Sequence, residues 1–141
     1  MPAPVDDAIL TVDSIVVRYD TAEGPITAVD NISFKVRPGE FLSVIGPSGC
    51  GKSTLFNVIG GLLGHNIGVV SVAGETISGP HQSIGMVFQE ESTFPWRTVI
   101  DNVAFPLELI GMARPQRAER ARHFIKMVGL DGFENRYPAE V

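Results

Sequence analysis

The stretch that decides the fold is Gly46-Pro47-Ser48-Gly49-Cys50-Gly51-Lys52-Ser53, which has the spacing G-x-x-x-x-G-K-[ST]. A nearly continuous apolar run, residues 41–45, comes before it, and a helical pattern over about residues 52–63 comes after it. A buried strand, a glycine-rich turn and a helix form the context in which this spacing binds phosphate groups. The alternative is a glycine-rich turn that carries a solvated lysine.

The residue types of this loop suit a triphosphate. Gly49 and Gly51 allow positive φ and a close approach of the backbone to an anion. The first amides of the following helix have no partner and point at the anion. Lys52 would bridge the β- and γ-phosphates, and the Ser53 hydroxyl would bind Mg²⁺. The expected nucleotide-binding residues of the loop are Gly46, Ser48, Gly49, Cys50, Gly51, Lys52, Ser53 and Thr54.

The composition is that of an ordinary globular protein. The chain has 141 residues, 44% of them hydrophobic, and a net charge of −5 from 11 basic and 16 acidic residues. This acidic balance argues against a nucleic-acid partner. The single cysteine, Cys50, cannot form an intrachain disulfide, which is typical of a reducing compartment. The first seven residues lack the basic start of a secretory signal.

One uncharged stretch, residues 55–73, is long enough to span a bilayer. Four glycines, two asparagines and a histidine interrupt it, so we expect a helix, a loop and a strand there instead.

Alternating apolar residues predict an antiparallel β region in the first third of the chain. The alternation slips between Val12 and Ile15, which indicates a bulge in the first strand, and a second strand covers residues 32–36. Residues 41–45 have the continuous apolarity of a strand buried on both faces of a parallel sheet. Further short strands are expected at residues 69–73 and 84–88.

The tail of the chain reads as helical. Thr98 and Asp101 have the spacing of a capping box, and Pro106 should kink or end the helix that starts there. Pro115 suits the first turn of a second helix, which Gly129 can close.

The charge changes from −6 over residues 1–96 to +1 over residues 97–141. We therefore expect a nucleotide-binding core over residues 1–96 and the start of a helical subdomain over 97–141. The basic residues of the second helix are expected to form a solvated face. They are Arg114, Arg117, Arg120, Arg122 and Lys126.

Three further features lie around the loop in order: Tyr19, which ends the first strand, Gln89, which ends the strand of residues 84–89, and the run of residues 93–103, which begins Thr93-Phe94-Pro95-Trp96-Arg97-Thr98. Together with the loop they resemble the ATP-binding cassette (ABC) transporter ATPase family over almost the whole chain. The Pro95-Trp96-Arg97 stretch resembles the nitrate, sulfonate and taurine importer branch. The resemblance implies the α/β fold of a P-loop NTPase. Its N-terminal portion has an antiparallel β subdomain, an incomplete parallel core sheet and then a helical subdomain.

The resemblance also implies roles for single residues. Tyr19 would stack on adenine, although a strand-end aromatic that covers the core is the alternative. Gln89 would contact Mg²⁺ and the attacking water, unless it is an ordinary polar residue at a strand end. With Lys52, it completes the expected catalytic pair. Phe94, Pro95 and Trp96 would contact a membrane permease, where exposed aromatic residues suit an interface. The alternative for these three is a local cluster inside the helical subdomain.

As an ABC ATPase, the chain would use ATP and Mg²⁺, pair with a second ATPase subunit and work indirectly with a solute-binding protein. It would lie in the cytoplasm, on the inner face of the membrane, and energise uptake of a small anion. The Leu-Ser-Gly-Gly signature, the Walker B strand, the catalytic glutamate and the switch histidine are absent from these 141 residues. We therefore expect the chain alone to be marginally stable or aggregation-prone and unable to hydrolyse ATP. A non-catalytic nucleotide-binding or interaction module is the alternative function. A GTPase is disfavoured because no Asn-Lys-x-Asp stretch is present.

Overall fold

The computed structural model describes residues 7–89 and 92–141. These residues belong to two compact units that divide between Val87 and Phe88. The division into a nucleotide-binding core over 1–96 and a helical subdomain over 97–141 stays a prediction.

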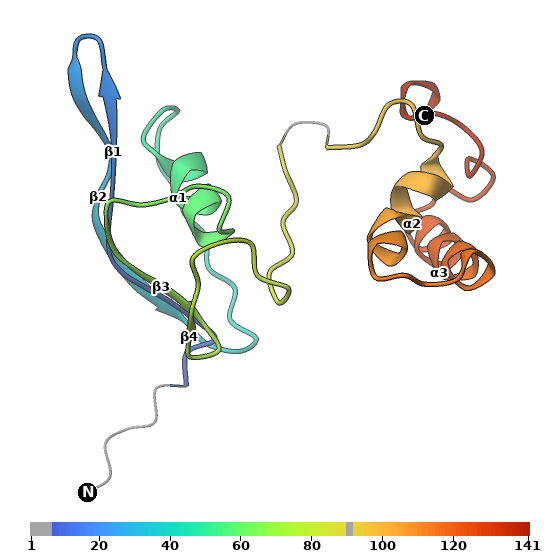
Figure 1. Ribbon diagram of the computed structural model, residues 1–141, viewed down its shortest axis with the longest axis horizontal. Coiled ribbons are helices and arrows are strands. Elements are labelled where there is room, and N and C mark those ends of the chain that lie inside the picture. The colour runs from blue at the N-terminus through green and yellow to red at the C-terminus, as the bar shows by residue number, and fades with distance from the viewer. Residues whose placement is uncertain (1–6, 90–91) are drawn as a thin grey trace, which may run out of the picture. The chain divides into compact units, whose positions relative to one another are not determined.

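The first unit is built on a four-stranded antiparallel sheet in the order β2-β1-β3-β4 (Figure 1). Its register shifts between Val12 and Ile15, where Ser14 has a φ of 53°, which confirms the expected bulge. Ala73 and Gly74 both have positive φ and form the tight turn before the last strand. The strands are β1 (Leu10–Thr21), β2 (Gly24–Val36), β3 (Ile67–Val72) and β4 (Glu75–Thr76).

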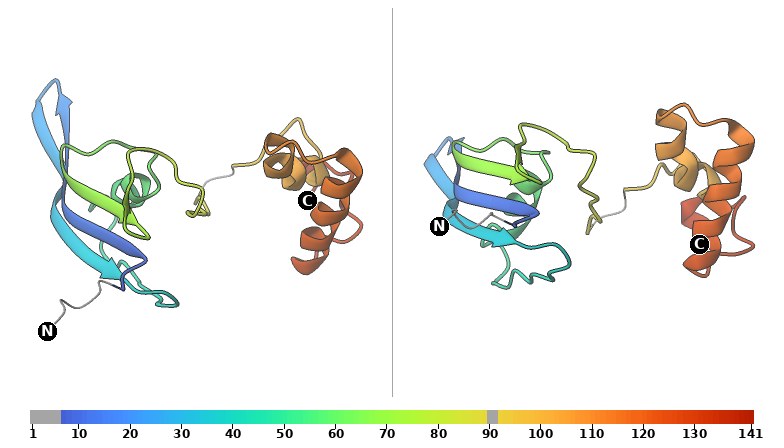
Figure 2. Two further views of the ribbon diagram at one scale, coloured as in Figure 1. Left: turned by 60° about the horizontal axis from the view of Figure 1, so that its bottom comes forward. Right: turned by 90° about the horizontal axis from the view of Figure 1, so that it is seen from below.

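Helix α1 (Lys52–Ile59) packs against one face of this sheet (Figure 2). Its buried residues Leu55 and Val58 join a core that contains Ile15 of β1 and Val70 of β3. Helix α1 ends at Ile59, earlier than the end near residue 63 that the sequence pattern predicted. Gly61 has a φ of +70°, and a side chain there would overlap the carbonyl oxygen of Gly79, so the chain must turn at this point.

The parallel strand expected at residues 41–45 and the short strand expected at residues 84–88 do not form. Among the described residues, only the strands β1, β2, β3 and β4 take part in the sheet. Neither run therefore has a neighbouring strand with which to exchange backbone hydrogen bonds. Phe41 and Ile45 are 91% and 93% exposed, and Val87 is fully exposed. Ile84 packs against the core of the first unit, and Val44 and Met86 are partly buried, but the other apolar side chains of the two runs stay exposed.

The second unit contains α2 (Val99–Leu109), α3 (Arg114–Met127) and a short 3₁₀ turn, η1 (Pro138–Glu140). Helices α2 and α3 lie side by side and bury Ala104 and Ala121. Pro106 does not end α2, which continues to Leu109, and the alternative expectation of a kink at this proline stays a prediction. Pro115 lies in the first turn of α3, and Gly129 follows the helix with a φ of 78°, as expected.

None of the helices in the described part of the chain has the length and apolarity that a membrane span requires.

The exposed apolar run gives a direct test of the fold. We expect the double variant Phe41→Ser, Ile45→Ser to self-associate less than the parent chain in light scattering. Its unfolding free energy should stay within about 0.5 kcal/mol, because exposed side chains contribute little to stability. Ile15→Ala is the matched contrast, since Ile15 is fully buried. It should lose about 2–5 kcal/mol. A large loss of stability in the serine variant would show that residues 41–45 are buried in solution.

Candidate functional site

The loop before α1 has the backbone geometry that the sequence predicts. Gly49 and Gly51 have φ values of +78° and +93°, and Gly51 is the residue from which α1 starts. A side chain on Gly51 would overlap the carbonyl oxygen of Ala28 in β2. Glycine is therefore required at Gly51 for two reasons, the left-handed backbone and the close contact with the sheet.

The N-terminus of α1 has no side-chain cap. Its helical ladder begins with the bond from Leu55 N–H to the Gly51 carbonyl, 2.9 Å long. The amides of the three preceding residues have no acceptor within the helix. Unpaired amides and the positive end of the helix dipole together favour an anion at this point.

The ammonium group of Lys52 bends back over the loop. Its Nζ donates to the carbonyl oxygens of Gly46, at 2.8 Å, and Pro47, at 2.6 Å. The Sγ of Cys50 is 3.6 Å from the same nitrogen. The loop thus holds a positive charge in place by its own backbone, next to the unpaired amides of α1.

A cleft of about 390 Å³ opens between this loop and β2. Cys50, Gly51 and Lys52 line one side, and residues 27–30 line the other. Asp30 in that wall was not identified from the sequence, where an isolated acidic residue in a strand gives no signal. A phosphate group near its carboxylate would need a cation between the two, because like charges repel at short range.

Tyr19 lies beside the cleft in the ladder. It pairs with Ile26 of β2, whose next two residues, Thr27 and Ala28, belong to the wall of the cleft. The strand β1 continues past Tyr19 to Thr21, and the tyrosine is 41% exposed.

Ser53 is exposed and Thr54 is half-buried at the start of α1. Gln89 is exposed at the start of the second unit. Its contact with Mg²⁺ stays a prediction.

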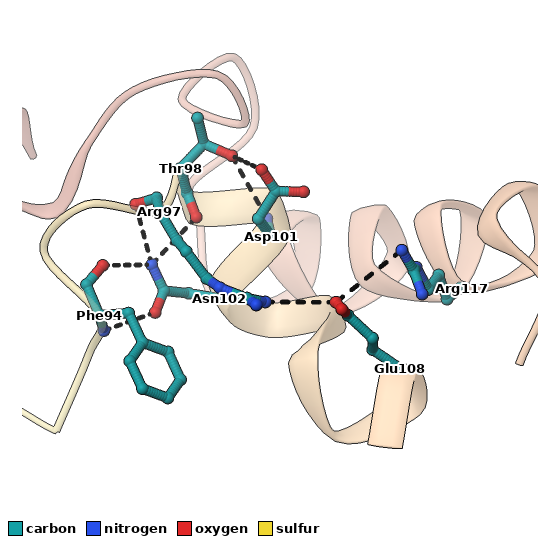
Figure 3. A network of polar contacts seen from close by, with 7 residues as sticks. All are labelled: Phe94, Arg97, Thr98, Asp101, Asn102, Glu108 and Arg117. Carbon is teal, nitrogen blue, oxygen red and sulfur yellow. Dashed lines mark hydrogen bonds and ion pairs between the residues drawn. The ribbon is translucent and has the colours of Figure 1, made fainter. Parts of the chain in front are cut away.

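The aromatic stretch of the second unit is held by one amide side chain (Figure 3). The Asn102 Oδ1 accepts from the Phe94 N–H at 2.7 Å. Its Nδ2 lies 3.0 Å from the carbonyl oxygens of Phe94, Arg97 and Thr98. Asn102 therefore fixes the backbone of residues 94–98 against α2.

Side-chain contacts brace the same stretch. The Phe94 ring lies 4.8 Å from Phe105 and 5.6 Å from Trp96, measured between centroids. The Arg97 guanidinium lies over both phenylalanine rings and pairs with Glu108 at 3.2 Å. Phe94 thus takes part in a local cluster of its unit. Trp96 is 72% exposed, and Pro95 is exposed as well.

The N-terminus of α2 differs from that of α1, since its amides have partners. The N–H groups of Val99 and Ile100 donate to the carbonyl oxygens of Arg136 and Glu134, at 2.8 and 2.9 Å. Thr98 Oγ1 accepts from the Asp101 N–H and donates to its carboxylate. The expected cap at Thr98 forms, but not as a full capping box. The Asp101 carboxylate accepts from the Thr98 hydroxyl, whereas in a capping box it would accept from the Thr98 N–H.

Comparisons with known proteins agree with this geometry. A family model described as ABC transporter matches residues 29–140. An uncharacterized ABC transporter ATP-binding protein of Methanocaldococcus jannaschii is 45% identical over 132 residues, which are 94% of this chain and 49% of that protein. The taurine import ATP-binding protein TauB of Escherichia coli is 48% identical over 110 residues, 78% of this chain and 43% of TauB. The chain therefore spans about half the length of the curated relatives it matches.

Solved structures give the same result. The ATP-binding cassette MJ0796, in a dimeric post-hydrolysis state bound to ADP and Pi, superimposes with a TM-score of 0.84 at 30% identity. The match covers 94% of this chain and 62% of that one. This likeness confirms the expected fold class.

The two loop glycines provide a matched test of the site. Alanine at either position meets a positive φ, which costs about 1–2 kcal/mol. Only at Gly51 does the added methyl group also overlap the Ala28 carbonyl, since a Cβ on Gly49 meets nothing within 4 Å. We expect Gly51→Ala to lower the melting temperature clearly more than Gly49→Ala. Equal losses in thermal unfolding would contradict the close contact between the loop and β2.

Trp96 is the single tryptophan of the chain and reports on its own loop. We expect Asn102→Ala to increase quenching of Trp96 fluorescence by acrylamide, because residues 94–98 lose their common partner. The unpaired backbone groups should also cost about 1–3 kcal/mol of unfolding free energy. Asn135→Ala, at an exposed asparagine, should change neither value. Unchanged quenching in the Asn102 variant would contradict the role of this amide.

Proposed function

Because the chain belongs to the ABC transporter family, we propose that it binds ATP with Mg²⁺ through residues 46–54, as part of the ATP-binding subunit of an importer. The observation that carries the proposal is the uncapped start of α1. There, positive-φ glycines and the Lys52 ammonium surround unpaired amides. The N-terminus of α2 offers no comparable site because protein groups occupy its amides.

The residues present fit a triphosphate. Lys52 would exchange its bonds to the Gly46 and Pro47 carbonyls for bonds to phosphate oxygens, so that its charge stays paired throughout. The Ser53 hydroxyl, exposed at the first turn of α1, would take a place in the coordination sphere of Mg²⁺. The metal, when bound, neutralises charge on the phosphates and screens them from Asp30.

The base and the γ-phosphate involve residues outside the loop. Tyr19 would stack on adenine, which its exposure and its place beside the cleft support. Gln89 would contact Mg²⁺ and the attacking water, as the family resemblance implies.

The transported substrate is proposed to be a small anion such as nitrate, a sulfonate or taurine. The support is the similarity to TauB, which is named for taurine import. Phe94, Pro95 and Trp96 would contact the permease, and the exposure of Trp96 on a braced loop supports this. A second copy of the subunit and a solute-binding protein would complete the transporter, with the ATPase in the cytoplasm on the inner face of the membrane.

The 141 residues by themselves are proposed to bind ATP without turnover, because phosphoryl transfer depends on groups that position the attacking water. A non-catalytic module that binds nucleotide and docks on a permease is the second candidate function. It is favoured by the exposure of Trp96 within the stretch 94–98 that Asn102 holds by hydrogen bonds. Robust hydrolysis of Mg-ATP by the purified 141-residue chain would remove this candidate.

Lys52→Ala tests the nucleotide site. We expect it to weaken binding of a fluorescent ATP analogue by at least a hundredfold, which corresponds to about 2.8 kcal/mol. Lys126→Ala removes the same charge from an exposed position of α3 and should leave binding unchanged.

Alkylation of Cys50 provides a second measurement in the same pair of variants. The thiol is exposed in the loop, so ATP should slow its labelling in the parent chain and in Lys126→Ala but not in Lys52→Ala. Equal affinity of all three chains for the analogue would exclude the assignment of the phosphate loop.

A further inference from the structure

A second concave site lies in the second unit, among residues to which no binding role has been assigned above. A cavity of about 200 Å³ lies among α2, α3 and the segment that contains Asn135. Three arginines line it, Arg114, Arg117 and Arg122, together with one carboxylate, that of Asp101. Three guanidinium groups around one small cavity form a concentrated positive charge that the solvated face expected from the sequence does not explain.

The position of these arginines on α3 is unfavourable for the helix itself. Arg114 is its first residue and Arg117 lies in its first turn, next to the positive end of the helix dipole. The turn contains no acidic residue, and the helix start has no side-chain cap. Residues that break a local rule without a visible gain in stability are characteristic of functional positions.

The available carboxylates do not neutralise the cavity. Arg97 and Arg117 share the carboxylate of Glu108, whose Oε2 lies 3.2 Å from a guanidinium nitrogen of Arg97 and 3.8 Å from one of Arg117 (Figure 3). The Asp101 carboxylate accepts from the Thr98 hydroxyl at 2.8 Å. Within the described residues, Arg114 and Arg122 form no ion pair. Two guanidinium groups with all their donors available therefore remain at the rim of the cavity.

We propose that this cavity binds a phosphate group, held by the guanidinium groups of Arg114, Arg117 and Arg122. The planar fork of an arginine matches two oxygens of a tetrahedral anion, which a lysine cannot do. The open N-terminus of α3 adds its dipole to the same attraction. Asn135 supplies a neutral amide at the wall. The ligand is a phosphate group either free in solution or on a lipid headgroup, and the site shares no residue with the nucleotide loop.

The experiment is a titration of the full chain with inorganic phosphate at constant ionic strength, followed by amide chemical shifts. The chain carries Lys52→Ala, so the result does not depend on the proposed nucleotide site. We expect shifts at Ala118 and Asn135. Arg114→Gln with Arg122→Gln should weaken this binding at least tenfold. Arg120→Gln with Lys126→Gln is the matched control. It removes two charges from exposed positions of the same helix outside the cavity, and it should change the affinity less than twofold.

A second arm uses vesicles of phosphatidylcholine with and without phosphatidic acid. Cosedimentation that requires phosphatidic acid and is lost in the Arg114, Arg122 variant would assign the phosphate to a headgroup. Equal weakening in both pairs of variants would reduce the effect to diffuse charge and overturn the proposal. The absence of any binding to phosphate or to vesicles would overturn it as well. Circular dichroism of both variants checks that α3 remains helical.

Discussion

The hydrogen-bonding state of each helix start decides what the chain can bind. The amides at the start of α2 donate to carbonyls of residues 134 and 136 and to the Thr98 hydroxyl, so that end is closed to ligands. The start of α1 is left open by a loop whose glycines turn the carbonyls toward Lys52 and leave the amides free. An unpaired amide costs free energy unless water or a ligand reaches it. The amides at the start of α1 therefore need water or a ligand as their partner.

The antiparallel part of the first unit supports this loop without help from the expected parallel strands. Gly51 contacts the Ala28 carbonyl of β2, and Leu55 of the following turn enters the core formed by β1 and β3. The run 41–45, in contrast, forms no strand and is mostly exposed, although Val44 and Ile45 line the cleft beside the loop. The loop therefore takes its geometry from its contacts with α1 and the antiparallel sheet, even though residues 41–45 before it form no strand.

Local patterns in the sequence were enough to predict much of this. The bulge in β1, the cap at Thr98, the start of α3 at Pro115 and the positive φ of Gly51 each follow from neighbouring residues. What failed required partners distant in sequence. Residues 41–45 have a strand's pattern but no neighbour to pair with. Asp30 and Asn102 gave no signal because their importance lies in contacts that one sequence does not display.

The two basic sites differ in how the protein prepares them. In the nucleotide loop, Lys52 already donates to two carbonyls, so its charge is positioned before any ligand arrives and little rotamer entropy remains to be lost. At the α3 cavity, Glu108 restrains Arg117 through its second bond to Arg97, whereas Arg114 and Arg122 keep their rotameric freedom. Binding there must order two long side chains, which lowers affinity and makes it sensitive to salt. If both proposals hold, the α3 cavity would respond to high local concentrations of phosphate groups, whereas the preorganised loop would retain one nucleotide.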